Sequence, residues 1–291
     1  MHHLIEQMIE PYHCKTNTDY KNALKEIIQE IALLGLSRSD FFSIVAFYGG
    51  SALRIFYKLD RFSEDLNFSL IKTDSSFDIK KYCHAIETEL KSFGLDVHVV
   101  KKEKEQLTGI KSAFIKANTL IRLLKIDGLP SPLQGIHKNE KLQIKLEVDT
   151  NPPPGADFDI SYNLNPIPYG VKLYSLPCLF AGKLHAVLCR EWRNNRIKGL
   201  DFYDFIWFIS KLIPVHLEHL ENRMKQTGHI EKKTRLTKAV LLKRLEKRFQ
   251  DINFEQAKSD VLPFVRDPFS LEVWSTKFFC SLLPKLKFYS F

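Results

Sequence analysis

The chain has 291 residues, 44% of them hydrophobic, which is enough for a full core in one large domain or two smaller ones and excludes disorder of the whole chain. An excess of 43 Lys and Arg over 34 Asp and Glu gives a formal net charge of +9, which suits a polyanionic partner such as RNA and equally an ordinary solvated surface. No apolar run approaches the ~18 residues of a membrane span, and the start of the chain lacks a secretory pattern. We therefore expect a cytoplasmic protein that does not enter a membrane.

The first predicted elements lead into a glycine turn. Residues 18–34 place apolar side chains at helical spacing and predict an amphipathic core helix. Residues 44–48 form a short apolar run that stops at Gly49 and Gly50, which predicts a buried strand entering a tight turn. Residues 51–57 then begin a helix.

The pattern stays mixed up to about residue 170. Residues 63–70 alternate, so that Asp65 and Asn67 share one face of a predicted strand. The next predicted elements are a helix over 78–93 and strands over 95–100, 112–126 and 142–149. These patterns predict an α+β domain with a mixed sheet over residues 1–170.

Helical patterning dominates from residue 176 onward, so a helical domain is predicted over residues 171–291 and the last third of the chain is expected to be all-helical. Residues 231–248 form a basic helical stretch, for which a solvated helix face is favoured over an RNA-binding surface. Five scattered cysteines without a C-x-x-C pair argue against a disulfide framework or a zinc finger. His84 and His185 show no partners at metal-ligand spacing and are interpreted as structural or surface histidines.

The strongest chemical signal combines the turn at Gly49-Gly50-Ser51 with the acids of the following strand. A glycine turn before a helix N-terminus offers backbone N–H groups and a helix dipole to phosphate, and alternate acids on a strand can hold Mg²⁺ in one cavity. The tripeptide alone fits an ordinary turn in which Ser51 caps the helix. Joined to Asp65 it indicates chemistry on a nucleoside triphosphate.

The stretch FYGGSALRIFYKLDRFSEDLNFSL resembles the N-terminal motif of the AbiEii/AbiGii nucleotidyltransferase toxins, which usually reads G-G-T/S-A-L and then R-x-S-x-D-hydrophobic-D-F. The resemblance implies a nucleotidyltransferase fold with Mg²⁺ held by Asp65. It also implies a set of nucleotide-binding residues, namely Gly49, Gly50, Ser51, Arg61 and Ser63. A surface ion pair between Arg61 and Asp65 is the alternative.

Two further positions complete the implied metal site. Asn67 stands where the family commonly has a second metal-binding Asp, and an amide oxygen is a weaker ligand for a hard cation than a carboxylate. The stretch KLQIKLEVDTNPPPG resembles the family segment that supplies a third ligand, here Glu147, with Asp149 as the runner-up. Solvated acids on a half-exposed strand are the alternative for both.

A third stretch, LPCLFAGKLHAVLCREWRNNRIKGLDFYDFIWFI, resembles the helical motifs of the family. By that resemblance Lys183 contacts the phosphates of the nucleotide, and Asp201 or Asp204 completes the catalytic site by orienting the lysine or the acceptor hydroxyl. The alternatives are a lysine extending from an apolar helix and two acids that charge a helix start. Leu200 occupies a place where the family often has Arg.

The implied activity is Mg²⁺-dependent transfer of a nucleotide from an NTP to an acceptor hydroxyl, in a cleft between the two domains. RNA, with tRNA 3′ ends as one possibility within the family, is the expected acceptor, and a cognate antitoxin is the expected protein partner. A protein phosphotransferase that uses the same NTP pocket, or a nucleotide- or RNA-binding module with weakened catalysis, remain the alternative functions.

Overall fold

A computed structural model describes residues 2–95, 97–101, 119–126, 142–191 and 197–289. The chain divides into two compact units. The first unit comprises Met1–Lys58, Phe62–Pro152 and Asp159–Leu173, and the second comprises Leu59–Arg61, Pro153–Phe158 and Tyr174–Phe291. The simpler division at residue 170 stays a prediction. None of the described helices is both long and apolar enough to cross a membrane.

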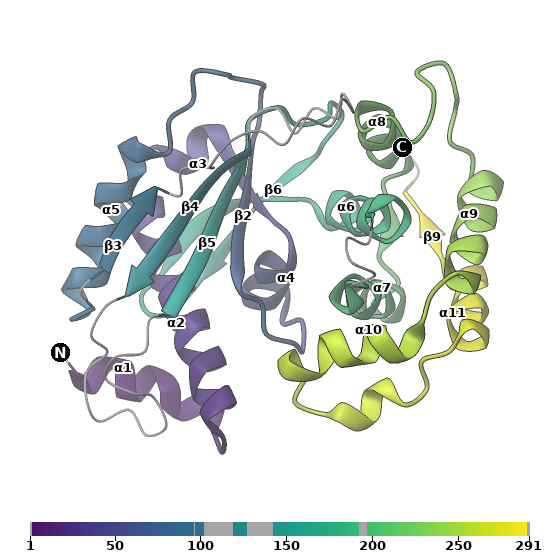
Figure 1. Cartoon of the computed structure of the whole chain (residues 1–291). Helices are drawn as coiled ribbons and strands as arrows, with labels where there is room; N and C mark the ends of the chain where they lie inside the picture. Colours follow the sequence, from purple (N-terminus) through teal and green to yellow (C-terminus); the bar gives the residue numbers. More distant parts are fainter. Residues whose placement is uncertain (1, 96, 102–118, 127–141, 192–196, 290–291) are drawn as a thin grey trace. The chain divides into compact units, whose positions relative to one another are not determined.

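The first unit is built around a mixed sheet, and its strands in the described part of the chain follow the order β3-β4-β5-β2-β1-β7-β6 (Figure 1). The strands are β1 (Val45–Tyr48), β2 (Asp65–Leu70), β3 (Val97–Lys101), β4 (Thr119–Ile126), β5 (Leu142–Asp149), β6 (Phe158–Asn163) and β7 (Tyr169–Tyr174). Strand β2 is antiparallel to β1 and parallel to β5, and β7 is parallel to β1. The predicted mixed sheet is confirmed, although residues 112–118 of one expected strand lie outside the described residues.

The centre of the sheet follows from the hydrophobic pattern. Strand β1 lies between β2 and β7, so its residues from Val45 to Phe47 are buried on both faces. Residue Ile44, which was expected to open this strand, instead ends the short helix α3 (Phe41–Ile44). Strands β6 and β7 were not predicted.

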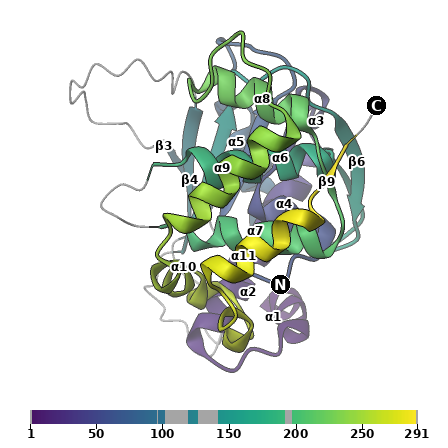
Figure 2. The ribbon, with the colours of Figure 1, turned by 90° about the vertical axis from the view of Figure 1, so that its right-hand side faces the viewer.

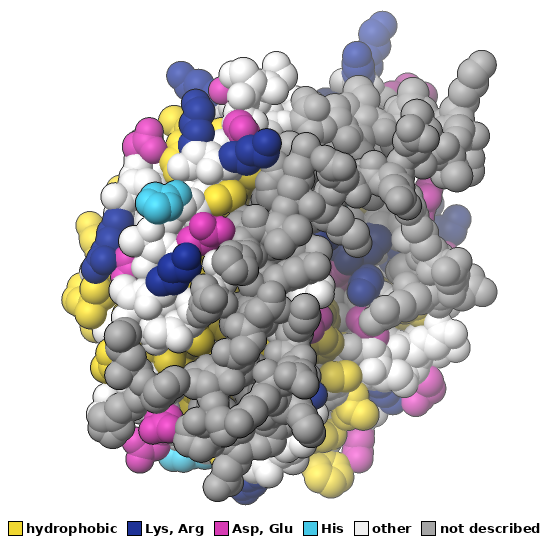
Figure 3. All heavy atoms as spheres, turned by 60° about the vertical axis from the view of Figure 1, so that its left-hand side comes forward, with side chains coloured by type: hydrophobic (Ala, Val, Ile, Leu, Met, Phe, Trp, Pro, Cys, Tyr) yellow, Lys and Arg dark blue, Asp and Glu magenta, His cyan; other side chains and the backbone are white. Residues whose placement is uncertain are grey.

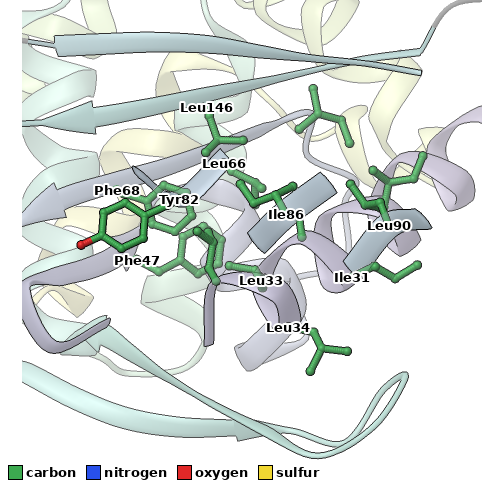
Figure 4. Close-up of a cluster of buried hydrophobic side chains, with 14 of the residues drawn as sticks. Ile31, Leu33, Leu34, Phe47, Leu66, Phe68, Tyr82, Ile86, Leu90 and Leu146 are labelled. Carbon is green, nitrogen blue, oxygen red and sulfur yellow. The ribbon is translucent and has the colours of Figure 1, made fainter. Parts of the chain in front are cut away.

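The helices of the first unit are α1 (His2–Ile9), α2 (Asn17–Ser37), α3, α4 (Gly50–Tyr57) and α5 (Lys80–Ser92). Helix α2 begins at a capping box formed by Thr16 and Asp19, which satisfies backbone N–H groups of its first turn. Helices α2 and α5 pack together because Gly35 has no side chain, since a Cβ there would lie 2.7 Å from the carbonyl oxygen of Ala85. Their apolar faces meet the sheet in one core, where residues such as Ile31, Ile86 and Phe68 are fully buried (Figure 4).

The second unit is mainly helical, with α6 (Leu176–Cys189), α7 (Gly199–Ser210), α8 (Leu217–Gln226), α9 (Lys238–Gln250), α10 (Phe254–Val261) and α11 (Thr276–Leu282). Figure 2 shows α9 and α11 in front of α6 and α7. A core of buried aromatic rings joins α7, α9 and α11 through Phe205, Phe249 and Phe279.

Two details of the second unit differ from the prediction. The last third of the chain was expected to be all-helical, but it also contains the short strands β8 (Pro214–Val215) and β9 (Lys287–Phe288), which pair in parallel. The basic helix expected over 231–248 begins only at Lys238, where the side chain of Thr237 caps it by accepting a hydrogen bond from the N–H of Val240. Its buried stripe is Leu241, Leu245 and Phe249, and Lys243 and Lys247 are exposed.

Candidate active site

The glycine turn lies at the end of β1 and opens helix α4. Gly49 has φ +89° and ψ −163°, a backbone conformation that is readily available only to glycine. A Cβ at this position would also lie 3.2 Å from Nδ2 of Asn67. The turn therefore requires glycine for two reasons, and Gly49, which directly precedes α4, lies beside the Asn67 side chain.

Ser51 has a defined structural partner. Its side chain is fully buried, and its hydroxyl donates a hydrogen bond to the backbone carbonyl of Asp65. This bond fastens the start of α4 to the start of β2. Ser63 lies just before β2, and its backbone carbonyl accepts a hydrogen bond from Nε2 of Gln29 at 2.9 Å.

Three predicted metal ligands share one face of the sheet. Asp65 and Asn67 alternate with the buried Leu66 along β2, so both face away from the core. Strand β5 runs parallel beside β2 with Asn67 opposite Glu147. Register partners in neighbouring strands carry their side chains on the same face, so the sheet brings together two carboxylates and an amide.

Glu147 forms an ion pair with Lys145, two residues earlier on the same strand. A cation bound by Glu147 therefore competes with the ammonium group of Lys145. Asp149 opposes Ser69 of β2, one alternation further along the strand, and its carboxylate accepts a hydrogen bond from the N–H of Asn151 at 3.0 Å.

Lys183 anchors a second cluster, which lies within the second unit. Its Nζ is 2.6 Å from Oδ2 of Asp204 and 3.4 Å from Oδ1 of Asp201. Helix α6 supplies the lysine, and α7 supplies both acids, which lie one turn apart at positions i and i+3. Arg190 adds a contact of 3.3 Å to Asp201. The structure thus brings together the lysine and both of its predicted acidic partners.

Arg61 belongs to this second cluster. Its Nε and Nη2 donate to the two carboxylate oxygens of Asp204 at 2.7 Å each, and its side chain is only 2% exposed. Because both of these N–H groups bind Asp204, the direct role of Arg61 is to fix the position of that carboxylate. Among the described residues, the cations Arg61, Lys183 and Arg190 contact the carboxylates of Asp201 and Asp204.

Asp204 is ionised despite complete burial. Burial alone raises the pKa of its carboxyl group, but the charges of Arg61 and Lys183 and their hydrogen bonds outweigh that effect and lower the pKa below its usual value. The negative charge of Asp204 lies 2.6 Å from Nζ of Lys183 and so limits the positions of that ammonium group.

Sequence reasoning placed Lys145 on the same face of the strand as Glu147 but gave it no role, and it did not consider Arg190. An ion pair between Lys145 and Glu147 could have been expected from their opposite charges at positions i and i+2. Arg190 directly follows α6, where cations favour the C-terminal end of the helix dipole. Its contact with Asp201 depends on how α6 and α7 pack, which the sequence does not state.

Comparison with solved structures defines the class of the fold. MenT4, a nucleotidyltransferase toxin from Mycobacterium tuberculosis H37Rv, is similar with a TM-score of 0.50, 14% sequence identity and 99% of each chain covered. JHP933 from Helicobacter pylori is similar with a TM-score of 0.47 and 16% identity, covering 88% of this chain and 85% of that one. The likeness to MenT4, at this identity, supports a nucleotidyltransferase fold and nothing finer.

The family follows from the sequence match. A family model described as the nucleotidyl transferase AbiEii toxin of type IV toxin–antitoxin systems matches residues 31–279. The chain therefore belongs to the AbiEii family and is a nucleotidyltransferase, which confirms the resemblance seen in its motifs. Membership in a toxin–antitoxin family implies an NTP substrate and a cognate antitoxin. A comparison with curated proteins gave no match.

Proposed function

We propose that this nucleotidyltransferase transfers a nucleotide from an NTP to a hydroxyl group of an RNA, with a tRNA 3′ end as one candidate acceptor, and that Mg²⁺ serves the reaction. The proposal rests first on one observation, the register that sets Asn67 of β2 opposite Glu147 of β5, with Asp65 on the same face. Nucleotidyl transfer moves a multiply charged group, so it requires cations and N–H donors around the phosphates.

The donor set fits Mg²⁺. Asp65, Asn67 and Glu147 offer only oxygen ligands, which hard divalent cations prefer, and they lie beside the turn at Gly49. When bound there, Mg²⁺ would neutralise phosphate charge in the transition state. The first turn of α4, including the N–H groups of Gly50 and Ser51, is suited to hold phosphate oxygens.

Lys183 is assigned to the phosphates, as its family position implies. Asp204 orients it from a buried position fixed by Arg61, and Asp201 is the second acid within reach of its ammonium group. Because Asp201 also contacts the half-exposed Arg190, it is the better candidate to approach an acceptor hydroxyl.

RNA is supported by the net charge of +9. On the described surface that Figure 3 shows, Lys and Arg side chains lie among Asp and Glu side chains, so this view does not single out an RNA-binding face. RNA is therefore proposed as the acceptor from the type of reaction and the net charge, not from a binding surface, and it must be tested directly.

Label transfer tests the reaction. Purified protein is incubated with Mg²⁺, a total RNA or protein pool, and NTPs labelled at either the α- or the γ-phosphate. Transfer of the α-label to RNA is expected. Transfer of the γ-label to protein instead would assign a phosphotransferase, and no transfer of either label would leave a binding module, so both outcomes contradict the proposal.

Paired variants test the assigned residues. Lys183→Ala and Asp65→Ala should each lower the rate of label transfer about 100-fold or more, since such contacts commonly contribute ~3 kcal/mol to the transition state. Matched controls are Lys225→Ala, which removes a surface lysine paired with Glu221, and Glu64→Ala, which removes the exposed partner of Lys25. Control variants that lose as much activity as Lys183→Ala would refute the assignment.

A further inference from the structure

Three potential metal ligands that are not among the residues assigned to catalysis meet in the second unit. His185 and Cys189 lie on α6 at positions i and i+4, so one face of the helix presents both. His229 follows α8 in the chain. One ligand atom from each of the three residues lies within 4.8 Å of those of the other two.

The two imidazole rings are already held in place. Oγ1 of Thr227 lies 2.9 Å from Nε2 of His185 and 2.8 Å from Nδ1 of His229. The same hydroxyl donates its proton to the carbonyl oxygen of Arg223 at 2.9 Å, so it faces both rings as an acceptor. Polar groups that fix the rings of metal-binding histidines in this manner are typical of metal sites.

We propose that His185, Cys189 and His229 form a binding site for a zinc-like transition-metal ion, with water in the fourth position. Two imidazoles and a thiolate suit Zn²⁺ and are poor ligands for Mg²⁺, so this site is chemically separate from the oxygen ligands of the catalytic metal. The ion would fasten the C-terminal end of α6 to the segment that follows α8.

The distances fit with a small adjustment. Tetrahedral zinc with bonds of about 2.0–2.1 Å to nitrogen and about 2.3 Å to sulfur needs ligand atoms roughly 3.4–3.8 Å apart. The three ligand atoms lie within 4.8 Å of one another, so no pair has to approach by more than about 1.4 Å. A small shift of the three side chains supplies such a change, and it has to leave both rings within hydrogen-bond distance of Thr227.

The protonation state of His185 favours metal binding, and that of Cys189 opposes it. Burial, followed by the charge of Arg223, lowers the pKa of His185 to about 3, so its ring is neutral and keeps a lone pair at physiological pH. Burial raises the pKa of Cys189 to about 12, partly offset by Arg244, Arg248 and Arg223. The metal therefore has to displace the thiol proton, and binding should release one proton.

A second group, Asp157, Cys178 and His216, also brings potential ligands together in this unit. Its thiol accepts a hydrogen bond from the N–H of Asp157 at 3.3 Å, and its imidazole ring stacks on Tyr289. These contacts give Cys178 and His216 structural roles, so His185, Cys189 and His229 are the stronger site, and Cys178 serves as the comparison in the test.

Cobalt titration of the full, tag-free chain tests the proposal. After removal of metal with a chelator, Co²⁺ should bind at about one equivalent and give a thiolate-to-cobalt charge-transfer band. The band should disappear in Cys189→Ser, and His229→Ala should weaken cobalt binding at least about tenfold. Cys280→Ser, a half-buried cysteine outside the cluster, should keep the band.

Two results would overturn the site. One is a wild-type protein that gives no saturable charge-transfer band, and the other is a band that survives in Cys189→Ser but is lost in Cys178→Ser. Should a variant fail to fold, X-ray absorption at the zinc edge of the wild-type protein decides the matter. One sulfur and two imidazole nitrogens support the site, and an all-oxygen shell or absence of zinc after loading refutes it.

Discussion

Replacing Asp204 with Asn tests how the buried charge cluster is held together. In the wild type, Asp204 accepts two hydrogen bonds of 2.7 Å from Arg61 and lies 2.6 Å from the ammonium group of Lys183. Asn keeps the shape but offers one acceptor oxygen. Whichever way the amide is turned, its NH₂ group faces an N–H donor of a cation, and the negative charge is lost.

The size of the effect follows from burial. Arg61 is 2% exposed, so removing its partner leaves an uncompensated buried charge, which costs about 3–5 kcal/mol of unfolding free energy. Asp201→Asn is the matched control, because its contacts with Lys183 and the half-exposed Arg190 are 3.4 and 3.3 Å long. Asp201 is also buried, but its contacts are longer, so that change should cost less, about 1–2 kcal/mol.

Urea unfolding at pH 7 measures both changes. The pKa of Asp204 is lowered in the folded protein, because the charges of Arg61 and Lys183 outweigh burial. Its carboxylate therefore contributes stability above the pKa of the unfolded chain, and that stability is lost as the pH falls through the folded value. The gap between wild type and Asp204→Asn should narrow in acid. Equal losses for Asp204→Asn and Asp201→Asn at pH 7 would refute this account.

Three further changes test other parts of the molecule. Burial and the charge of Glu26 raise the pKa of Glu30 from 4.5 to about 7, so the stability of the wild type should fall as the pH rises between these values. In urea unfolding, Glu30→Gln should therefore stabilise the protein by about 3 kcal/mol at pH 8 and by little at pH 4.5. An equal effect at both pH values would contradict this. Gly49→Ala should lower the unfolding free energy by about 1–3 kcal/mol because of the positive φ at this position. The control Gly182→Ala, with no atom within 4 Å of the added Cβ, should raise it by up to about 1 kcal/mol. Thermal unfolding that changes the stability of both variants in the same direction would be inconsistent with this reasoning. Asn67→Asp adds a carboxylate to the proposed metal site and should strengthen Mg²⁺ binding without nucleotide in calorimetry, while unchanged affinity would exclude Asn67 from the site.

Sequence reasoning found strands with an alternating period and also β1, which is a continuous apolar run that ends at two glycines. Strand β5 alternates strictly between buried and less buried residues, and its predicted limits, 142–149, match the structure. Strand β7 also buries Tyr169, Val171 and Leu173, but Pro166 and Pro168 precede it and suggest a loop. Its parallel pairing with β1 depends on tertiary contacts that outweigh this local signal.

For the candidate site, the sequence showed which residue types are present but not which of them contact one another in space. Period two on β2 indicates that Asp65 and Asn67 share a face. The register that brings Glu147 opposite Asn67 arises from pairing of distant strands. The bond between Arg61 and Asp204 spans 143 positions, so the motif that contains Arg61 could not show which acid it meets.

The placement of Arg61 bears on how the protein can be divided for experiments. The compact unit that contains Asp204 also takes in the short stretch Leu59–Arg61, which the chain reaches long before that helix. A C-terminal fragment cut near residue 170 would contain Asp204 and Lys183 without the guanidinium that binds both carboxylate oxygens. During synthesis on the ribosome, Arg61 is made well before Asp204, so the ion pair between them cannot form until α7 has been synthesised.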